Sequence, residues 1–282
     1  MTDKRLTSWK EAGLSNSFMF RLVMEKPELC RMLIETVLDI KIRKLEYLEP
    51  EKSFEAKLAS KGIRLDIYAE DDAGTAYDIE MQVAGSDKRN LGRRTRYYQS
   101  LMDDDALKKG MLYSRLRKSV IIFICTFDPF DRGLGRYTFS SLCREDNSLE
   151  LGDEVTKVFI NTTGDKHQLT RELVSLMEYI NEGKVTDSFT EKLNDRVAAL
   201  RDDDGKEALF MTYQQTLLEV EDKGIQKGIK KGIQKGIQKE KLANIRNLMN
   251  NANWTAKMAM DMLGVPVNEQ AVYADILGVS LQ

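Results

Sequence analysis

Two runs of alternating apolar and polar residues, separated by a short turn, constrain the fold of this chain more than any other feature. Residues 63–70 (IRLDIYAE) and 76–83 (AYDIEMQV) both follow a period of two, which is typical of strands with one buried face. Asp71-Asp72-Ala73-Gly74 lies between them, and Gly74 can adopt the positive φ that tight turns require. We therefore predict an antiparallel hairpin of two half-buried strands.

The register of this hairpin decides which polar side chains meet. Pairing of Glu70 with Ala76 places Asp66 opposite Glu80, with Gln82 two residues further along the same face. Directly opposed residues have Cβ atoms about 5 Å apart, so two carboxylates repel there unless a proton or a cation lies between them. Mg²⁺, which prefers oxygen ligands, would satisfy both. A solvated strand face gives the same alternation, so periodicity leaves both interpretations open.

The sequence around the hairpin resembles the PD-(D/E)XK nucleases, in particular their transposase-like and recombination-promoting branch. The similarity includes RLDIY (64–68), YDIEMQ (77–82), residues 94–116, residues 120–130 and the KGIQ repeats near the end, so it covers most of the chain in order. In that family an Asp on one strand precedes Glu-x-Lys or Glu-x-Gln on the next, and Asp66, Glu80 and Gln82 match these positions. Gln82 stands where many members have Lys, and Ser17 stands where we expect an acidic residue.

The resemblance implies an α+β fold of the restriction-endonuclease type, with an αβββαβ core and a mixed sheet. The order of the predicted elements agrees with it: helix 26–40, strand 42–48, the hairpin, helix 87–103 and strand 120–125. It also implies a Mg²⁺-dependent DNA endonuclease linked to DNA mobility or recombination, for which Mn²⁺ could replace Mg²⁺. Asp66 and Glu80 would bind the metal ion, and Gln82 would orient the water that the ion activates for hydrolysis of the phosphodiester.

Two other classes of protein share some of these features. A nuclease-derived scaffold could bind DNA, or its own copies, with weak or no cutting, and Gln82 and Ser17 keep this alternative open. A two-carboxylate glycosidase needs the same acidic residues, but its clefts usually offer aromatic platforms, and this hairpin has only Tyr68 and Tyr77.

Composition and charge limit the classes of site and the cellular location that we expect for this protein. The net charge is −2 and the pI is about 5.8, so any surface that binds nucleic acid must be local. The only histidine, His167, lies in a polar, turn-like stretch (TTGDKHQ), which argues against histidine-based triads and zinc sites. The three cysteines show no paired spacing. No apolar run reaches transmembrane length and the first residues do not resemble a signal peptide, so we expect a cytoplasmic protein.

A cluster of arginines follows the hairpin on the predicted helix 87–103. Arg89, Arg93, Arg94 and Arg96 are the candidate DNA contacts, because three of them recur at spacings of three or four residues and can form a basic stripe. A solvated charged helix face would have the same composition. Gln99, near the end of this helix, matches a glutamine that some nucleases of this class place beside the metal ion, so we expect it to support the site.

The C-terminal third of the chain is expected to be helical and separate from the nuclease-like domain. We predict a domain at 1–186, a helical extension at 187–222, a repeat helix or linker at 223–240 and a small helical module at 241–282. The repeat KGIQKGIKKGIQKGIQK has six lysines and no acidic residue. Its four-residue period makes the isoleucines drift by about 40° per repeat, and each glycine costs about 1 kcal/mol relative to alanine. We expect these C-terminal helices to form homo-oligomers or to contact DNA.

Overall fold

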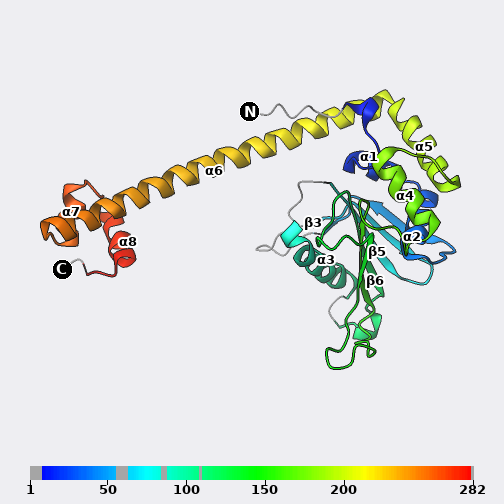
Figure 1. The fold of residues 1–282 in the computed structure, drawn as a ribbon, viewed down its shortest axis with the longest axis horizontal. Helices are drawn as coiled ribbons and strands as arrows, with labels where there is room; N and C mark the ends of the chain where they lie inside the picture. The colour runs from blue at the N-terminus through cyan, green and yellow to red at the C-terminus, as the bar shows by residue number, and fades with distance from the viewer. Residues whose placement is uncertain (1–7, 55–62, 84–87, 108–109, 281–282) are drawn as a thin grey trace. The chain divides into compact units, whose positions relative to one another are not determined.

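The computed structural model describes residues 8–54, 63–83, 88–107 and 110–280 (Figure 1). The chain forms two compact units, residues 1–211 and 212–282. Our predicted boundaries were at 186–187, 222–223 and 240–241, so the first unit extends beyond the end of the predicted nuclease-like domain. No helix in the described part of the chain is both long and apolar enough to span a membrane.

A mixed six-stranded sheet forms the centre of the first unit. In spatial order its strands are β1 (Leu45–Pro50), β4 (Ile67–Asp71), β5 (Ala76–Gln82), β6 (Ser119–Cys125), β8 (Val155–Asn161) and β7 (Arg136–Phe139). β5, β6 and β8 are parallel, whereas β1, β4 and β7 pair antiparallel with their neighbours. A helix connects β5 to β6, as a parallel pair requires. The predicted mixed sheet and the predicted order of elements are therefore confirmed.

Helices cover both faces of this sheet (Figure 1). They are α1 (Ser17–Met24), α2 (Pro27–Leu38), α3 (Leu91–Ala106), α4 (Arg171–Glu182) and α5 (Ser188–Arg201), with 3-10 turns η1 (Trp9–Glu11), η2 (Lys88–Asn90) and η3 (Tyr113–Arg115). α1, α2, α4 and α5 pack on the sheet face that carries Ile67, Ile79 and Ile122. α3 packs on the other face, against Tyr68 and Phe123. The core thus has two layers, and α3 is the helix nearest the polar residues of β5.

The predicted hairpin differs from the observed one in two ways. Its first strand is interrupted at residues 65–66, where β3 (Ile63–Arg64) leaves the main sheet and pairs with β2 (Ser53–Phe54). Its second strand, β5, is buried along its whole length, so the prediction of a half-buried strand was wrong. β5 lies between β4 and β6, and helices cover both of its faces, which the alternation of a single strand could not reveal.

Two helices begin or end at residues other than the predicted ones. α2 stops at Leu38 because Asp39 adopts a left-handed conformation, with φ 56°. Ile40, the last residue of the predicted helix, therefore lies beyond α2 and is 39% exposed. α3 begins at Leu91, after η2, and continues to Ala106, beyond the predicted end at 103. Residue 87, the predicted start, lies outside the described residues.

The second unit is entirely helical in its described part. α6 (Asp204–Ala252) begins in the first unit and contains the KGIQ repeats without interruption. α7 (Ala256–Met262) and α8 (Val267–Leu277) follow it, and Thr255 caps α7 by accepting a hydrogen bond from the Met258 N–H at 3.2 Å. Ile245 of α6, Met260 and Tyr273 lie at the centre of a small core that these three helices share.

Candidate functional site

The turn between β4 and β5 fixes the register of the hairpin. Asp71 accepts hydrogen bonds from the N–H groups of Ala73 and Thr75, at 3.0 and 2.8 Å, and from the Tyr77 hydroxyl at 2.7 Å. Gly74 has a φ of 82°, as the turn prediction required. Glu70 then pairs with Ala76, which is the register inferred from the sequence.

This register brings Asp66 and Glu80 together, although Asp66 lies just before β4 begins. The Asp66 N–H donates to Glu80 Oε1 at 3.0 Å, and the Met81 N–H donates to Asp66 Oδ2 at 3.2 Å. Each carboxylate is therefore held by the backbone of the opposite strand. Gln82 follows on the same face, and its Nε2 donates to Glu80 Oε2 at 3.3 Å. The three residues predicted for catalysis thus form one hydrogen-bonded group.

Burial makes this group unusual in its electrostatics. Glu80 is 3% exposed and Gln82 is 7% exposed. Burial, together with the nearby Asp66 carboxylate, raises the pKa of Glu80 to about 8. Ionised carboxylates lose hydration energy when they are buried and repel one another when they are close. A cation among these oxygens would oppose both effects.

Asp78 adds a third carboxyl group that sequence reasoning counted only as a residue of the solvated strand face. It lies two residues before Glu80 on β5, is fully buried, and neither of its carboxylate oxygens has a hydrogen-bond partner among the described residues. Burial first, and then the charges of Glu80 and Asp66, raise the pKa of Asp78 well above its usual range. The signal was present in the sequence, because Asp78 shares the strand face of Glu80 and Gln82, but the cover provided by α3 was not evident.

Arg94 is the positive charge inside the group. Its guanidinium donates to Gln82 Oε1 at 2.7 Å, to Glu80 Oε2 at 3.3 Å and to the Tyr98 hydroxyl at 2.9 Å. We predicted Arg94 as a DNA contact on the outer surface, whereas the structure places it in the site. Its spacing could have revealed this, because it lies three residues after Leu91 and four before Tyr98, both of which are buried.

The other predicted residues of this helix lie outside the group. Arg89, Arg93 and Arg96 are exposed, as a contact with DNA phosphates would require. Gln99 donates to Asp103 and to Ser119, both at 2.8 Å. Because Ser119 pairs with Ala76, at the beginning of β5, Gln99 lies at the other end of the strand from Gln82. The structure therefore does not bring Gln99 to the carboxylates.

The carboxylates of the site fit a divalent cation such as Mg²⁺, which needs only one or two carboxylate ligands from the protein. Among the described residues, no three or more His, Cys, Asp or Glu side chains are arranged as a metal-binding set. Two carboxylates, Asp66 and Glu80, are however held together, and Asp78 has buried oxygens without partners beside them. Mg²⁺ is commonly bound through one or two carboxylates, with water and substrate phosphates completing its shell. The donor set is adequate for Mg²⁺ and unsuited to zinc.

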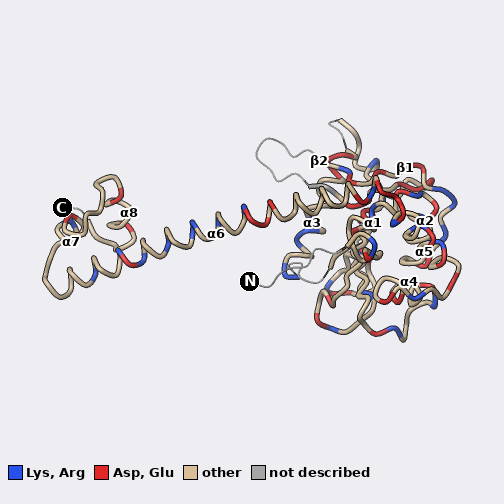
Figure 2. The backbone as a smooth tube through the Cα atoms, turned by 90° about the horizontal axis from the view of Figure 1, so that it is seen from above, with Lys and Arg blue, Asp and Glu red and all other residues tan. Residues whose placement is uncertain are grey.

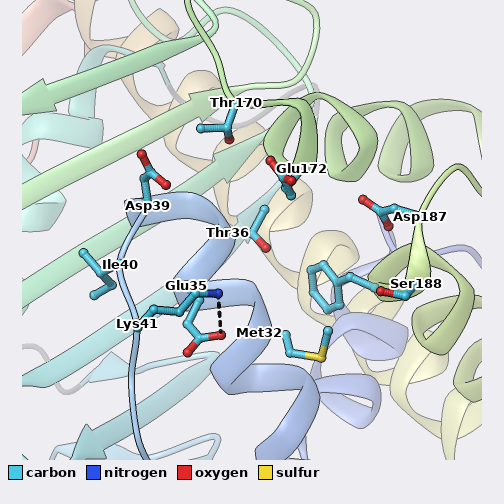
Figure 3. Close-up of a pocket in the computed structure, with 11 residues that line it drawn as sticks. Met32, Glu35, Thr36, Asp39, Ile40, Lys41, Thr170, Glu172, Asp187 and Ser188 are labelled. Carbon is cyan, nitrogen blue, oxygen red and sulfur yellow. Dashed lines mark ion pairs between the residues drawn. The ribbon is translucent and has the colours of Figure 1, made fainter.

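A separate cavity of about 560 Å³ lies on the other side of the sheet, between α2, α4 and α5 (Figure 3). Several of its polar groups already serve the fold. Glu35 accepts hydrogen bonds from Arg31 and from the Ile42 N–H, whereas Thr170 and Asp187 cap α4 and α5. This cavity contains none of the predicted site residues.

One of three comparisons with known proteins finds a match. A family model described as PD-(D/E)XK nuclease family transposase matches residues 15–198, which is more than half of the chain. The matched region includes the sheet, the helices α1 to α4 and all the residues of the site. A search of curated proteins found no match, and a search of solved structures found none either.

Proposed function

The chain belongs to the PD-(D/E)XK nuclease family of transposases, and from this we propose that it is a Mg²⁺-dependent DNA endonuclease that hydrolyses phosphodiester bonds. The observation that carries the proposal is the pair of backbone hydrogen bonds that fixes Asp66 against Glu80. Two carboxylates fixed so closely in a buried position are unfavourable for folding alone. They are useful for binding a cation that the substrate phosphate also contacts.

Each residue of the site has a distinct part in this reaction. Asp66 and Glu80 would hold the ion, and the Met81 carbonyl could provide a further ligand. When bound, Mg²⁺ lowers the pKa of a coordinated water and neutralises charge on the scissile phosphate. Gln82 orients the attacking water through its amide, which is neutral and cannot stabilise negative charge as Lys does. Arg94 supplies the missing positive charge, because its guanidinium contacts both Gln82 and Glu80.

The arginines outside the site would hold the DNA backbone. Arg89 in η2, and Arg93 and Arg96 in the first half of α3, are exposed, and Arg94 lies in the same half of α3. Phosphate contacts of this kind position a duplex without reading its sequence. Manganese, which accepts similar oxygen ligands, should replace Mg²⁺.

The test is incubation of supercoiled plasmid with the purified protein in Mg²⁺, in Mn²⁺ or in EDTA. We expect nicked and linear products with either metal ion, and none in EDTA. Asp66→Asn and Glu80→Gln should abolish cutting while the protein remains folded, whereas Glu182→Gln, on the exposed end of α4, should cut normally. Equal cutting by all three variants would contradict the assignment of the site.

One observation favours a second candidate, a DNA-binding scaffold with weak or no activity. Arg94 already neutralises part of the charge of Glu80 and occupies the amide oxygen of Gln82, so the protein can fold without a metal ion. In that case plasmid would be shifted in a gel by the protein but not cut with any divalent ion. Ser17, which begins α1, is consistent with this alternative because it provides no carboxylate.

A further inference from the structure

α6 is exposed on all of its sides from residue 215 to residue 237, and one of these sides combines apolar residues with glycines. Leu217, Val220, Gly224, Gly228 and Lys231 follow one another at spacings of three or four residues, so they share one side of the helix. Leu217 is 50% exposed and Val220 is 62% exposed. The isoleucines of the repeat, which spiral away from this side, are also about half exposed. Such a row of apolar side chains on a single helix is a candidate contact surface.

The glycines of this face are not required by the unit itself. A Cβ added at Gly224 or Gly228 would meet no atom within 4 Å, so alanine would fit both positions. Glycine inside a helix costs about 1 kcal/mol relative to alanine. Its advantage is that another backbone can approach closely. The two glycines therefore lower the stability of the helix, and a close contact from outside the unit would offset that loss.

The charges on the two sides of these glycines are opposite (Figure 2). On this side of the helix, Glu221 lies before the glycines, whereas Lys231 and Lys235 lie after them. Glu219 contacts Lys223 within the helix at 3.4 Å, with both side chains well exposed, and such a pair contributes little. The face therefore has an acidic and apolar half, a glycine centre and a basic half.

The basic half borders a groove of about 650 Å³ between α6 and α8. Lys231 and Lys235 line it together with Ile237 and Val272, and Lys241, which also lines it, forms an ion pair with Glu269 of α8 at 3.8 Å. A helix that presents leucine, valine and carboxylates has the shape and charge to fill this groove. The segment Leu217–Asp222 (LLEVED) has this composition.

We propose that two copies of this chain pair through antiparallel α6 helices, with the segment 217–222 of each copy filling the groove of the other. A two-fold axis at Gly228 places Glu221 against Lys235, because each lies seven residues from it. The acidic half of each helix then meets the basic half of its partner, and the same surface is used twice, as a two-fold interface requires. Parallel pairing would instead bring lysines against lysines.

DNA is the other candidate occupant, because lysines attract phosphates. The face disfavours it, since the Glu221 carboxylate and the large apolar side chains of Leu217 and Val220 lie on the same side of the helix as Lys231 and Lys235. A second copy of the chain offers opposite charges to both the acidic and the basic half of this face, whereas DNA phosphates would be opposite in charge only to the basic half. The pairing does not depend on nuclease activity.

Sedimentation velocity of the full-length chain tests the pairing with two reversed variants. The first carries Glu221→Lys and the second carries Lys235→Glu, the two residues that the two-fold axis brings together. Wild type should be a dimer, and each variant alone should dimerise about tenfold more weakly or worse, because like charges then face each other. An equimolar mixture of the two variants should form a heterodimer. A control with Lys223→Glu and Lys230→Glu, on the opposite side of α6, should remain a dimer.

Cysteine cross-linking tests the direction of pairing. In a Cys143→Ser background, Gly228→Cys should form an intermolecular disulfide on oxidation, because the two-fold axis passes near it. Leu217→Cys should not cross-link to itself, whereas a parallel pair would cross-link there. A wild-type protein that is monomeric at every concentration would overturn the proposal. So would a lysine-reversed variant that loses DNA affinity while its mass stays that of wild type.

Discussion

At the residue scale, the response of the site to protons and cations depends on three carboxyl groups and one guanidinium. The carboxyl groups belong to Asp66, Asp78 and Glu80, and the guanidinium belongs to Arg94. Asp78 and Glu80 are buried, Asp66 is half-buried, and Arg94 contacts only Glu80 among these acids through a described ion pair. Ionisation of Asp78 and Glu80 would therefore create an unfavourable excess of buried negative charge. Protonation of the acids and binding of a cation are alternative ways to relieve it.

The pH dependence of stability should reveal this excess. The pKa of Glu80 is about 8 in the folded protein, against 4.5 as its ordinary value. A raised acid pKa means that the folded state holds a proton that the unfolded state releases, so stability is greatest below pH 4.5 and is lost as the pH rises towards 8. Without metal ions, the free energy of unfolding should therefore fall across this window.

Glu80→Gln should flatten this fall, because the amide does not ionise. Urea denaturation at several pH values, in EDTA, provides the measurement. Glu182→Gln is the matched control, since its side chain is exposed. Equal slopes for wild type and Glu80→Gln would show that Glu80 ionises normally in the folded protein.

Arg94 should matter far more than its neighbour on the helix. Arg94→Gln removes the cation that contacts Gln82 and Glu80, and it should reduce the rate of plasmid cutting by roughly a hundredfold. Arg93→Gln, which alters an exposed residue, should change DNA affinity slightly and leave the rate of cutting nearly intact. Adding Gln82→Lys to Arg94→Gln should restore part of the activity by returning a positive charge. Similar rates for the two single variants would contradict a role inside the site.

At the scale of elements, the β4–β5 turn holds the carboxylates in register. Asp71 accepts three hydrogen bonds and is 8% exposed. Asp72, beside it, accepts from the exposed Arg43 at 2.7 Å. Asp71 therefore holds the turn of the hairpin together, whereas Asp72 forms an ordinary ion pair at the surface.

Asp71→Ala should lower the free energy of unfolding by about 2–3 kcal/mol, because it leaves buried donors without a partner. Asp72→Ala should cost at most about 1 kcal/mol, as is usual for an exposed ion pair. Chemical denaturation of both variants, in the presence of EDTA, checks the difference. Equal losses would mean that the turn does not depend on the buried carboxylate.

Local sequence patterns predicted how β4 and β5 pair, but they could not predict which helices cover this hairpin. The alternation around Asp66 and Glu80, with the turn at Gly74, was sufficient for the register. Burial of Asp78 depends on α3, which follows in the sequence but packs across the sheet. The spacing of Arg94 from Leu91 and Tyr98 places it on the inward side of α3, but the sequence could not show that this side meets Gln82 and Glu80. The break before Asp66 arises from pairing with β2, a strand whose partner is not visible from local sequence.

At the scale of the molecule, the first unit includes the start of α6. Phe210 is fully buried, and its ring lies 5.1 Å from that of Trp9 and 5.6 Å from that of Phe18. The beginning of α6 therefore closes the core formed by the N-terminal helices. The repeat that follows has no such role in this unit.

A chain ending at residue 222 should fold, bind Mg²⁺ and cut plasmid, but it should not dimerise and should bind DNA with a weaker salt dependence. The six lysines of residues 223–239 account for the lost salt dependence. A chain ending at residue 203 lacks Phe210, and burial of a large aromatic side chain contributes about 3 kcal/mol or more, so its melting temperature should be clearly lower. Thermal melts, sedimentation and salt titrations of DNA binding compare the two. Equal melting temperatures would show that the first unit ends before α6.

Direct measurement of metal binding tests the central claim, which is that Asp66 and Glu80 form the metal centre. Calorimetric titration of metal-free protein with Mn²⁺ and with Mg²⁺, at pH 7.5 and without DNA, needs no assumption about activity. We predict saturable binding to wild type, a loss of binding of at least about tenfold in Asp66→Asn and in Glu80→Gln, and unchanged binding in Glu182→Gln. Binding of equal affinity in wild type and in both site variants would contradict the account.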